Sequence, residues 1–391
     1  LVRSRGLGDV YKRQPYQDTL GAMLPYSPLH YLLLNDSLKT LVMTSGNVRD
    51  EPICYKNEEA KIHLRSIADY FLFHNRGIHM RCDDSVTRVF EGRPYIIRRS
   101  RGYVPFPIKL SFPLEMILAC GGELKNTFCL TRDQYAFMSH HIGDLENLET
   151  LTSFEEGIEH FKRLFSIEPK AVAYDLHPDY LSTKYALSIL DIPKVGVQHH
   201  HAHIISCMAE NGIEGEVIGV ALDGTGFGTD DTIWGGEFLK ANFRDFFRVA
   251  HLKKVPMPGG TMAIKEPWRM AMVYLLEAFG DEAKDSKIDL MKRIDLQKWN
   301  ILETMIKKGL NTPLTSSMGR LFDAISSLLS VRDEVYYEGQ AAIELEMIAD
   351  HGGRDMYPFH IQKDENPMII DSTQIVRDVV RDLVKGVSTS K

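Results

Sequence analysis

The sequence predicts an α/β protein in two parts, the second of which ends in a largely helical segment. Between residues 171 and 222, short apolar runs typical of strands alternate with segments of helical periodicity. Helical periodicity then dominates residues 262–349. An extended segment rich in arginine and proline, residues 98–107, separates these features from the first part. Alternating strands and helices are typical of α/β domains built on a mixed sheet.

Composition excludes several classes of protein. The chain has 391 residues, enough for two or three domains at roughly 100–200 residues each. Hydrophobic residues make up 44% and charged residues 25%, the balance of a folded globular protein and not of a disordered or fibrous one. The net charge of −7 argues against a broad basic face, so we expect no nucleic acid partner.

The lack of a recognisable targeting signal and the scattered cysteines indicate a reducing compartment. No apolar run approaches the roughly 20 residues needed to span a bilayer, and the start of the chain shows no signal peptide. We therefore expect no membrane partner and a cytoplasmic location. The five cysteines are scattered and form no C-x-x-C pair, so the sequence predicts neither a disulfide framework nor a cysteine zinc site.

The first part of the chain mixes strand, turn and helix signals. Residues 1–14 carry four basic residues and no initiator methionine, and we interpret them as a non-native leader joined to a chain that begins near Pro15. The pattern predicts a buried strand over Leu41–Met43, followed by the turn residues Thr44–Asn47, and a helix over Glu58–Tyr70.

The second part opens with strand signals and continues with alternating elements. A β-meander is predicted over Met116–Cys120, Thr127–Thr131 and Tyr135–Ser139. Beyond it, the pattern predicts strands at Ala171–Tyr174, Val195–Val197 and Val217–Leu222 and helices at Phe154–Phe165, Tyr180–Leu190 and His199–Asn211. Two later helices are predicted, one beginning near Ser316 and one over Asp371–Val387.

The strongest chemical signal is the run of histidines that ends at His203. If a helix begins near His199, then His199 and His203 lie one turn apart on one face, where two imidazoles can bind one metal ion. The alternative is a histidine-rich cap with its rings in solvent, as His200 and His201 would be. Four histidines in five residues would be an unusual plain cap, so the pattern favours a metal.

A second signal follows the predicted strand Val217–Leu222. Asp223 stands at the end of this strand and precedes Gly224, Thr225 and Gly226, where glycines let backbone N–H groups approach a phosphate. The same four residues are also a common turn. Beside a histidine pair, Asp223 becomes a candidate oxygen ligand, and the resulting N,N,O set suits Zn²⁺ or Fe²⁺.

Weaker signals of the same kind are spread along the chain. The glycine pair Gly235 and Gly236 can let the backbone approach an anionic ligand. Gly319 and Gly339, at predicted helix starts, can do the same, and Asp323 follows Gly319 by one turn. In the first part, Ser45 and Asn47 offer a hydroxyl and an amide for such a ligand. Taken singly, each of these residues is explained as simply by ordinary turn or surface chemistry.

An ordered series of motifs runs from Leu24 to the C-terminus. They read LPYSPLHYLLL, MTSGN, HNRGIHMRCDDSVTR, RRSRGYVPFPI, LACGGELKNTF, SHHIGDLEN, DLHPDYLST, VQHHHAH, DGTGFG, WGGEF, SSMGRLFDA and YEGQAA. Short stretches such as D-G-T-G recur in many proteins, but this ordered series does not. It resembles the HypF family of hydrogenase-maturation carbamoyltransferases.

The resemblance implies two domains. Residues 15–108 are similar to the C-terminal part of a YrdC-like α/β domain. Residues 114–391 are similar to a TsaD-like carbamoyltransferase domain of the actin-like (ASKHA) fold, truncated at its C-terminal end. The family's acylphosphatase domain, its zinc-finger modules, the opening of its YrdC-like domain and a late aspartate metal ligand have no counterpart in this sequence. We therefore expect a fragment of a longer enzyme.

The resemblance also implies a staged reaction. In the family, carbamoyl phosphate and ATP yield carbamoyl-adenylate, whose carbamoyl group passes to the C-terminal cysteine of the partner protein HypE as a precursor of the cyanide ligand of NiFe hydrogenase. On this sequence, a divalent metal, zinc or iron, would be held by His199, His203 and Asp223, and ATP would bind with Mg²⁺. The resemblance assigns no catalytic residue. Nucleotide would contact Ser45 and Asn47 in the YrdC-like part and, in the TsaD-like part, Gly224, Thr225, Gly226, Gly235, Gly236, Gly319, Asp323 and Gly339.

Two other functions stay open at this stage. An O-carbamoyltransferase of antibiotic biosynthesis combines the same two domain types and modifies a small-molecule hydroxyl. A non-catalytic subunit that binds nucleotide and metal would keep the site for assembly with a partner.

Overall fold

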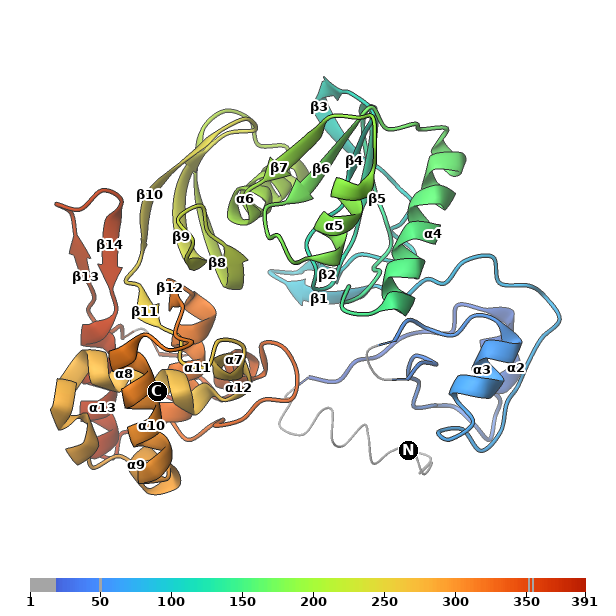
Figure 1. Ribbon diagram of the computed structural model, residues 1–391. Helices are drawn as coiled ribbons and strands as arrows, with labels where there is room; N and C mark the ends of the chain where they lie inside the picture. The colour runs from blue at the N-terminus through green and yellow to red at the C-terminus, as the bar shows by residue number, and fades with distance from the viewer. Residues whose placement is uncertain (1–18, 49–50, 351, 354) are drawn as a thin grey trace. The chain divides into compact units, whose positions relative to one another are not determined.

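The computed structural model describes residues 19–48, 51–350, 352–353 and 355–391. The chain forms two compact units, Leu1–Val197 and Gln198–Lys391, each of which is described by itself below. The predicted leader, residues 1–14, lies outside the described residues. The mixed α/β class predicted from the sequence is confirmed (Figure 1).

The N-terminal part of the first unit contains little regular structure among its described residues. Its elements are the helices α2 (Pro28–Leu33) and α3 (Asn57–His63) and the antiparallel hairpin of β1 (Val86–Phe90) and β2 (Arg93–Arg98). The helix predicted to reach Tyr70 is therefore shorter than expected. The buried strand predicted at Leu41–Met43 is wrong, because this described segment forms no strand and the side chains of Val42 and Met43 are exposed.

A five-stranded sheet made by described residues organises the rest of the first unit. The strand order is β3-β5-β4-β6-β7, with β4, β6 and β7 parallel and β5 antiparallel to both of its neighbours. The strands are β3 (Ile108–Leu114), β4 (Ile117–Ala119), β5 (Cys129–Met138), β6 (Ala171–Asp175) and β7 (Lys194–Val197). The predicted meander is wrong in one respect, because its second and third strands form the single strand β5.

Helix α4 (Leu148–Phe165) and helix α5 (Leu181–Ser188) complete this unit. Helix α4 begins earlier than predicted because the Asn147 side chain accepts a hydrogen bond from the N–H of Thr150 and caps the helix. Its buried face packs on the ring of Phe128. A Cβ at Gly157 would lie 2.9 Å from that ring, so glycine is what allows the helix to approach.

The second unit is built on a larger sheet, seven-stranded in the described residues. Six of its strands follow the order β11-β12-β9-β10-β14-β13. The seventh strand, β8, pairs antiparallel with β9. The strands are β8 (Val217–Phe227), β9 (Ile233–Ala241), β10 (Phe246–Leu252), β11 (Val255–Pro256), β12 (Leu314–Thr315), β13 (His360–Gln362) and β14 (Met368–Asp371).

Helices dominate residues 262–349 of this unit, as the sequence predicts, and others flank this region. They are α6 (His199–Asn211), α7 (Met262–Lys265), α8 (Pro267–Phe279), the 3-10 helix Gly280–Asp285, α9 (Leu290–Arg293), α10 (Leu296–Lys308), α11 (Met318–Leu328), α12 (Gln340–Ile348) and α13 (Thr373–Val384). Helix α8 is buried on nearly all sides and packs against α11 and α13 (Figure 1). Among the described residues, no helix is both long enough and apolar enough to cross a membrane.

The buried ring of His140 should make the first unit sensitive to acid. His140 is 3% exposed, and burial lowers its pKa from 6.5 to about 4. Between these two pH values the unfolded chain binds more protons than the folded chain. The contribution of neutral His140 to the free energy of unfolding is therefore complete above pH 6.5 and is lost as the pH falls toward 4. The loss is on the order of 3 kcal/mol. The melting temperature of His140→Phe should therefore fall less steeply than that of the native chain between pH 6.5 and 4.5, whereas parallel curves would contradict this assignment.

Candidate metal centre

Helix α6 places the histidine pair as the sequence predicts, because it spans His199–Asn211. Gln198 caps the helix, with its side-chain oxygen accepting a hydrogen bond from the His201 N–H at 2.9 Å. The helix ends at Gly212, which adopts the left-handed conformation at φ 63°. His199 and His203 are thus one turn apart, and their Nε2 atoms lie 3.1 Å from each other.

Asp223 meets this pair from the neighbouring strand. The strand does not end at Leu222, as the sequence predicts, but continues to Phe227, and its pairing with β9 is irregular between Leu222 and Gly226. Asp223 therefore lies in a bulge. Its Oδ2 is 3.1 Å from His199 Nε2 and 3.9 Å from His203 Nε2, while Oδ1 accepts a hydrogen bond from Gly224 N–H at 2.6 Å.

These three side chains fit a single metal ion. The three candidate ligand atoms all lie within 4.8 Å of one another. Bonds of about 2.1 Å to one tetrahedral ion would place the ligand atoms roughly 3.4 Å apart, close to the distances found here. Asp223 Oδ2 is also buried without a hydrogen-bond partner, which is costly unless a further group binds it. The metal itself stays a prediction.

The electrostatics of the site favour an ionised aspartate beside a neutral His200 ring. Burial alone raises the pKa of Asp223, but the ion-pair contact with His199 at 3.1 Å and the charges of the neighbouring histidines outweigh it, so the pKa lies below 3.8. Burial lowers the pKa of His200 to about 4. A carboxylate and neutral imidazoles are the protonation states that a divalent metal requires.

The capping alternative expects the rings of His200 and His201 to face solvent. The structure contradicts it, because both rings are buried. His200 is fully buried, and His201 is 8% exposed. Nε2 of His201 lies 2.8 Å from the carbonyl oxygen of Asn242, and Nε2 of His200 lies 3.7 Å from Asp223 Oδ2. The sequence analysis missed His200 as a residue of the site, because the four-histidine run alone does not show which rings become buried.

The start of helix α11 is tied to the bulge that carries Asp223. The Ser317 hydroxyl faces the carbonyl oxygens of Asp223 at 2.9 Å and Gly224 at 2.7 Å, so its hydrogen is shared between them. The same oxygen caps α11 by accepting a hydrogen bond from Arg320 N–H. A Cβ at Gly319 would lie 2.9 Å from the Cα of Gly224. Gly319 therefore makes room for another segment of backbone.

Glycines 235 and 236 have a similar packing role on β9. A Cβ at Gly235 would lie 2.6 Å from the carbonyl oxygen of Asp223, and one at Gly236 would lie 2.5 Å from that of Ser316. Their N–H groups donate to Glu237 Oε1 at 3.1 and 3.3 Å. These amides thus already have an acceptor within the chain, and their contact with nucleotide stays a prediction.

Glu237 is a buried residue that the sequence analysis did not single out. Besides the two glycine amides, it accepts hydrogen bonds from the Ser316 hydroxyl at 2.5 Å and from Arg248 Nε at 2.6 Å. Arg248 in turn stacks over the Trp234 ring and pairs with Asp230. The one feature of the sequence that could have pointed to Glu237 is its position directly after the W-G-G motif.

The other predicted nucleotide residues of the second unit lie in three settings. Thr225 is half-buried within the bulge of β8. Asp323 pairs with Arg320 at 2.7 Å on helix α11, and burial raises the pKa of Asp323 to about 6. Gly339 precedes α12 with φ 71°, a conformation that favours glycine. Nucleotide binding by these three residues stays a prediction.

Ser45 and Asn47 belong to the first unit and line a cavity of about 570 Å³ there. Asn47 Nδ2 donates to the carbonyl oxygens of Val48 and Glu51, so this amide stabilises its own loop. The cavity also contains the pair formed by His141 Nδ1 and Asp83 Oδ2, 2.7 Å apart. Its basic side chains are Arg81, Arg98, Arg99 and Lys125.

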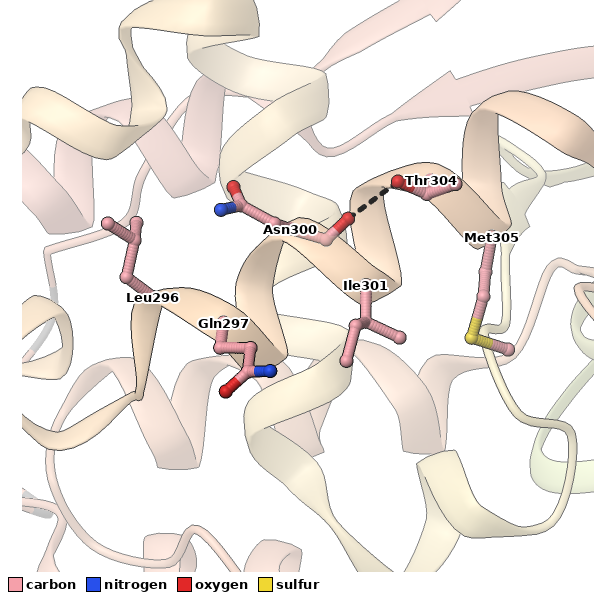
Figure 2. Close-up of a pocket in the computed structure, with 6 residues that line it drawn as sticks. All are labelled: Leu296, Gln297, Asn300, Ile301, Thr304 and Met305. Atoms are coloured by element: carbon pink, nitrogen blue, oxygen red, sulfur yellow. Dashed lines mark hydrogen bonds between the residues drawn. The ribbon is translucent and has the colours of Figure 1, made fainter.

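A second cavity, of about 590 Å³, lies on helix α10 and has a different character (Figure 2). Leu296, Ile301 and Met305 line it with the neutral polar residues Gln297, Asn300 and Thr304. The one hydrogen bond drawn there joins the Thr304 hydroxyl to the Asn300 carbonyl oxygen, within the helix (Figure 2). Its lining residues all belong to one helix and include no charged or metal-binding side chain.

Family models match almost the whole chain in consecutive segments. Residues 7–100 match the Sua5, YciO and YrdC model, described as telomere recombination. Residues 113–210 match the HypF Kae1-like domain, and residues 219–391 match the second subdomain of the carbamoyltransferase Kae1-like domain. The chain belongs to the HypF family. It is 42% identical over 382 residues to carbamoyltransferase HypF of Synechocystis and 43% identical over 360 residues to HypF2 of Cupriavidus necator.

Solved structures agree with these matches. A crystal structure of full-length HypF in the phosphate- and nucleotide-bound form is 47% identical and superposes with a TM-score of 0.90, covering 96% of this chain and 59% of that one. HypF of T. kodakarensis is 36% identical with a TM-score of 0.87, covering 97% of this chain and 51% of the other. The alignments cover 93% and 87% of this chain but only 49% and 44% of the Synechocystis and C. necator relatives. The chain thus spans about half the length of these relatives.

Removing the histidine pair should remove the metal. The variant His199→Ala/His203→Ala loses two of the three converging ligand atoms, so its zinc content after loading and dialysis should fall to background. His360→Ala, a change at an exposed histidine on β13, serves as the control and should keep native zinc content. Retention of zinc by the double variant would show that the metal binds elsewhere.

Two glycines of the bulge allow a matched test of its packing. A Cβ at Gly226 would lie 2.4 Å from His200 Cε1 and 2.9 Å from His199 Cδ2, whereas a Cβ at Gly224 meets no atom within 4 Å. Gly226→Ala should therefore displace the rings and weaken zinc binding by about tenfold or more. Gly224→Ala should bind zinc within about twofold of the native chain. Calorimetric zinc titrations measure both, and equal losses in the two variants would contradict the packing role.

Proposed function

We propose that the chain is the part of a cytoplasmic carbamoyltransferase of NiFe-hydrogenase maturation in which the carbamoyl group is transferred to its acceptor. Relatives named carbamoyltransferase HypF, 42 and 43% identical, support the activity. The observation on which the proposal chiefly rests is the convergence of His199, His203 and Asp223 on one point, with Asp223 Oδ2 buried and lacking a hydrogen-bond partner.

The proposed cofactor is one divalent metal, zinc or iron, held by those three side chains. Two imidazole nitrogens and one carboxylate oxygen suit either ion and leave coordination positions for substrate oxygens. When bound, the metal would supply a Lewis acid that polarises an oxygen of the transferred group. The Ser317 hydroxyl holds the backbone of the bulge, so the aspartate keeps its position relative to the histidines.

The proposed donor is carbamoyl-adenylate, made from carbamoyl phosphate and ATP with Mg²⁺. The proposed acceptor is the thiolate of a C-terminal cysteine on the partner protein HypE. The sulfur attacks the carbonyl carbon, a C–S bond forms, the C–O bond to the phosphate breaks, and AMP leaves with the electron pair. A thiolate is the strongest nucleophile among common side chains, and a chain terminus is able to reach the proposed metal centre.

Transfer can be tested by placing this chain in the matched segment of the Synechocystis relative. The chimaera, with ATP, carbamoyl phosphate and HypE, should add about 43 Da to HypE, the mass of a carbamoyl group replacing hydrogen. Mass spectrometry should find no addition when the C-terminal cysteine of HypE is replaced, and none with His199→Ala/His203→Ala.

Other outcomes identify the alternative functions. Addition to a small-molecule hydroxyl in place of the cysteine would identify an O-carbamoyltransferase. Nucleotide binding without any transfer would identify a non-catalytic subunit. Either result would overturn the proposal.

A further inference from the structure

The side-chain amide of Gln198 has a fixed orientation. Its Oε1 accepts a hydrogen bond from the backbone N–H of His201 at 2.9 Å. Its Nε2 donates to the carbonyl oxygen of Phe227 at 3.1 Å. A backbone N–H can only donate and a carbonyl oxygen can only accept, so the oxygen and nitrogen of the amide cannot be exchanged.

This orientation determines which nitrogen of His200 carries hydrogen. Nε2 of Gln198 also lies 3.2 Å from Nδ1 of His200. Because an amide nitrogen only donates, Nδ1 of His200 must be the acceptor and must lack a hydrogen. A neutral imidazole carries one hydrogen, which is therefore on Nε2.

The Nε2–H group of His200 faces the candidate metal centre. It lies 3.7 Å from Asp223 Oδ2, and each of these two buried atoms lacks a hydrogen-bond partner. A buried donor and a buried acceptor that both remain unpaired are costly, and a movement of well under 1 Å would join them. The glycine at 226 leaves room for this movement, because its Cα carries no side chain against the ring.

We propose that His200 is a positioning residue, whose Nε2–H donates to Asp223 Oδ2 and orients this carboxylate toward the metal, and that His200 is not itself a ligand. The inference rests on the proposed metal centre. A ligating carboxylate oxygen retains a lone pair for such a donor, and donors of this kind hold metal ligands in place. Gln198 thus acts on the centre through His200, and it also keeps the imidazole from presenting a lone pair to the metal.

Substitutions of His200 distinguish three roles for this residue: a hydrogen-bond donor to Asp223, a metal ligand, or a ring that only fills space. The amide nitrogen of His200→Gln reaches approximately as far as Nε2 of the ring, whereas that of His200→Asn reaches only as far as Nδ1. Zinc affinity, measured by competition with a chelator on the full chain, should stay within about threefold of native in His200→Gln and fall about 10–100-fold in His200→Asn. His200→Phe, which keeps the ring volume, should lose as much as His200→Asn. Melting temperatures identify any variant that fails to fold.

Nitrogen-15 NMR of the metal-free chain tests the tautomer without any activity. With histidine labelled and the His200 signals assigned by their loss in His200→Gln, Nδ1 should show the shift of an unprotonated ring nitrogen and Nε2 that of a protonated one. The reverse pattern would overturn the inference. Gln198→Glu replaces the donor by an acceptor, so Nδ1 should then become protonated, and zinc affinity should fall as in His200→Asn.

The outcomes distinguish this inference from the proposed function. Equal losses in His200→Gln and His200→Phe would make His200 a ligand, and native affinity in His200→Asn would make it a packing residue. In both cases the metal centre stands and the inference fails. If the native chain binds no zinc, the metal centre fails and the inference fails with it.

Discussion

The candidate site depends on the residue at which helix α6 begins. The cap by Gln198 starts the helix at His199, so His199 and His203 occupy one face and His200 turns into the protein. A start one residue later would rotate each ring by about 100° around the helix axis. Side-chain caps are worth about 1 kcal/mol, yet this one sets the direction of every imidazole in the site.

The second constraint is the close approach of backbone segments around Asp223. The bulge of β8 lies so close to the start of α6, to the strand β9 and to the start of α11 that a Cβ at Gly226, Gly235 or Gly319 would lie 2.4–2.9 Å from a neighbouring atom. Ser317 and Glu237 supply the hydrogen bonds that hold these segments together. Glu237 is fully buried, and such a charge is tolerated because Arg248, a hydroxyl and two amides satisfy it. Close packing of the backbone and the hydrogen bonds of buried polar groups thus together position the carboxylate of Asp223.

The sequence predicted the local parts of this arrangement. Helical periodicity gave the bounds of α6, and the i,i+4 spacing of His199 and His203 led directly to a shared metal. The family resemblance, based on twelve ordered motifs, was confirmed by family models and relatives.

Features that depend on contacts between distant segments were not predictable in the same way. The sequence predicted that β8 ends at Leu222, because D-G-T-G is typical of a turn, but pairing with β9 extends the strand through Asp223 as a bulge. The burial of His200 depends on Gly226, which is 26 positions away. The sequence also does not show that the buried Glu237 accepts hydrogen bonds from the amides of Gly235 and Gly236, whose contact with nucleotide stays a prediction. Single-residue patterns do not reveal such partners.

X-ray absorption at the zinc edge of the zinc-loaded chain is the most direct test of the central claim. The geometry predicts two imidazole nitrogens and otherwise oxygen ligands around the metal, with no sulfur from the five cysteines. A spectrum that requires three imidazoles or a sulfur ligand would contradict the assignment of His199, His203 and Asp223.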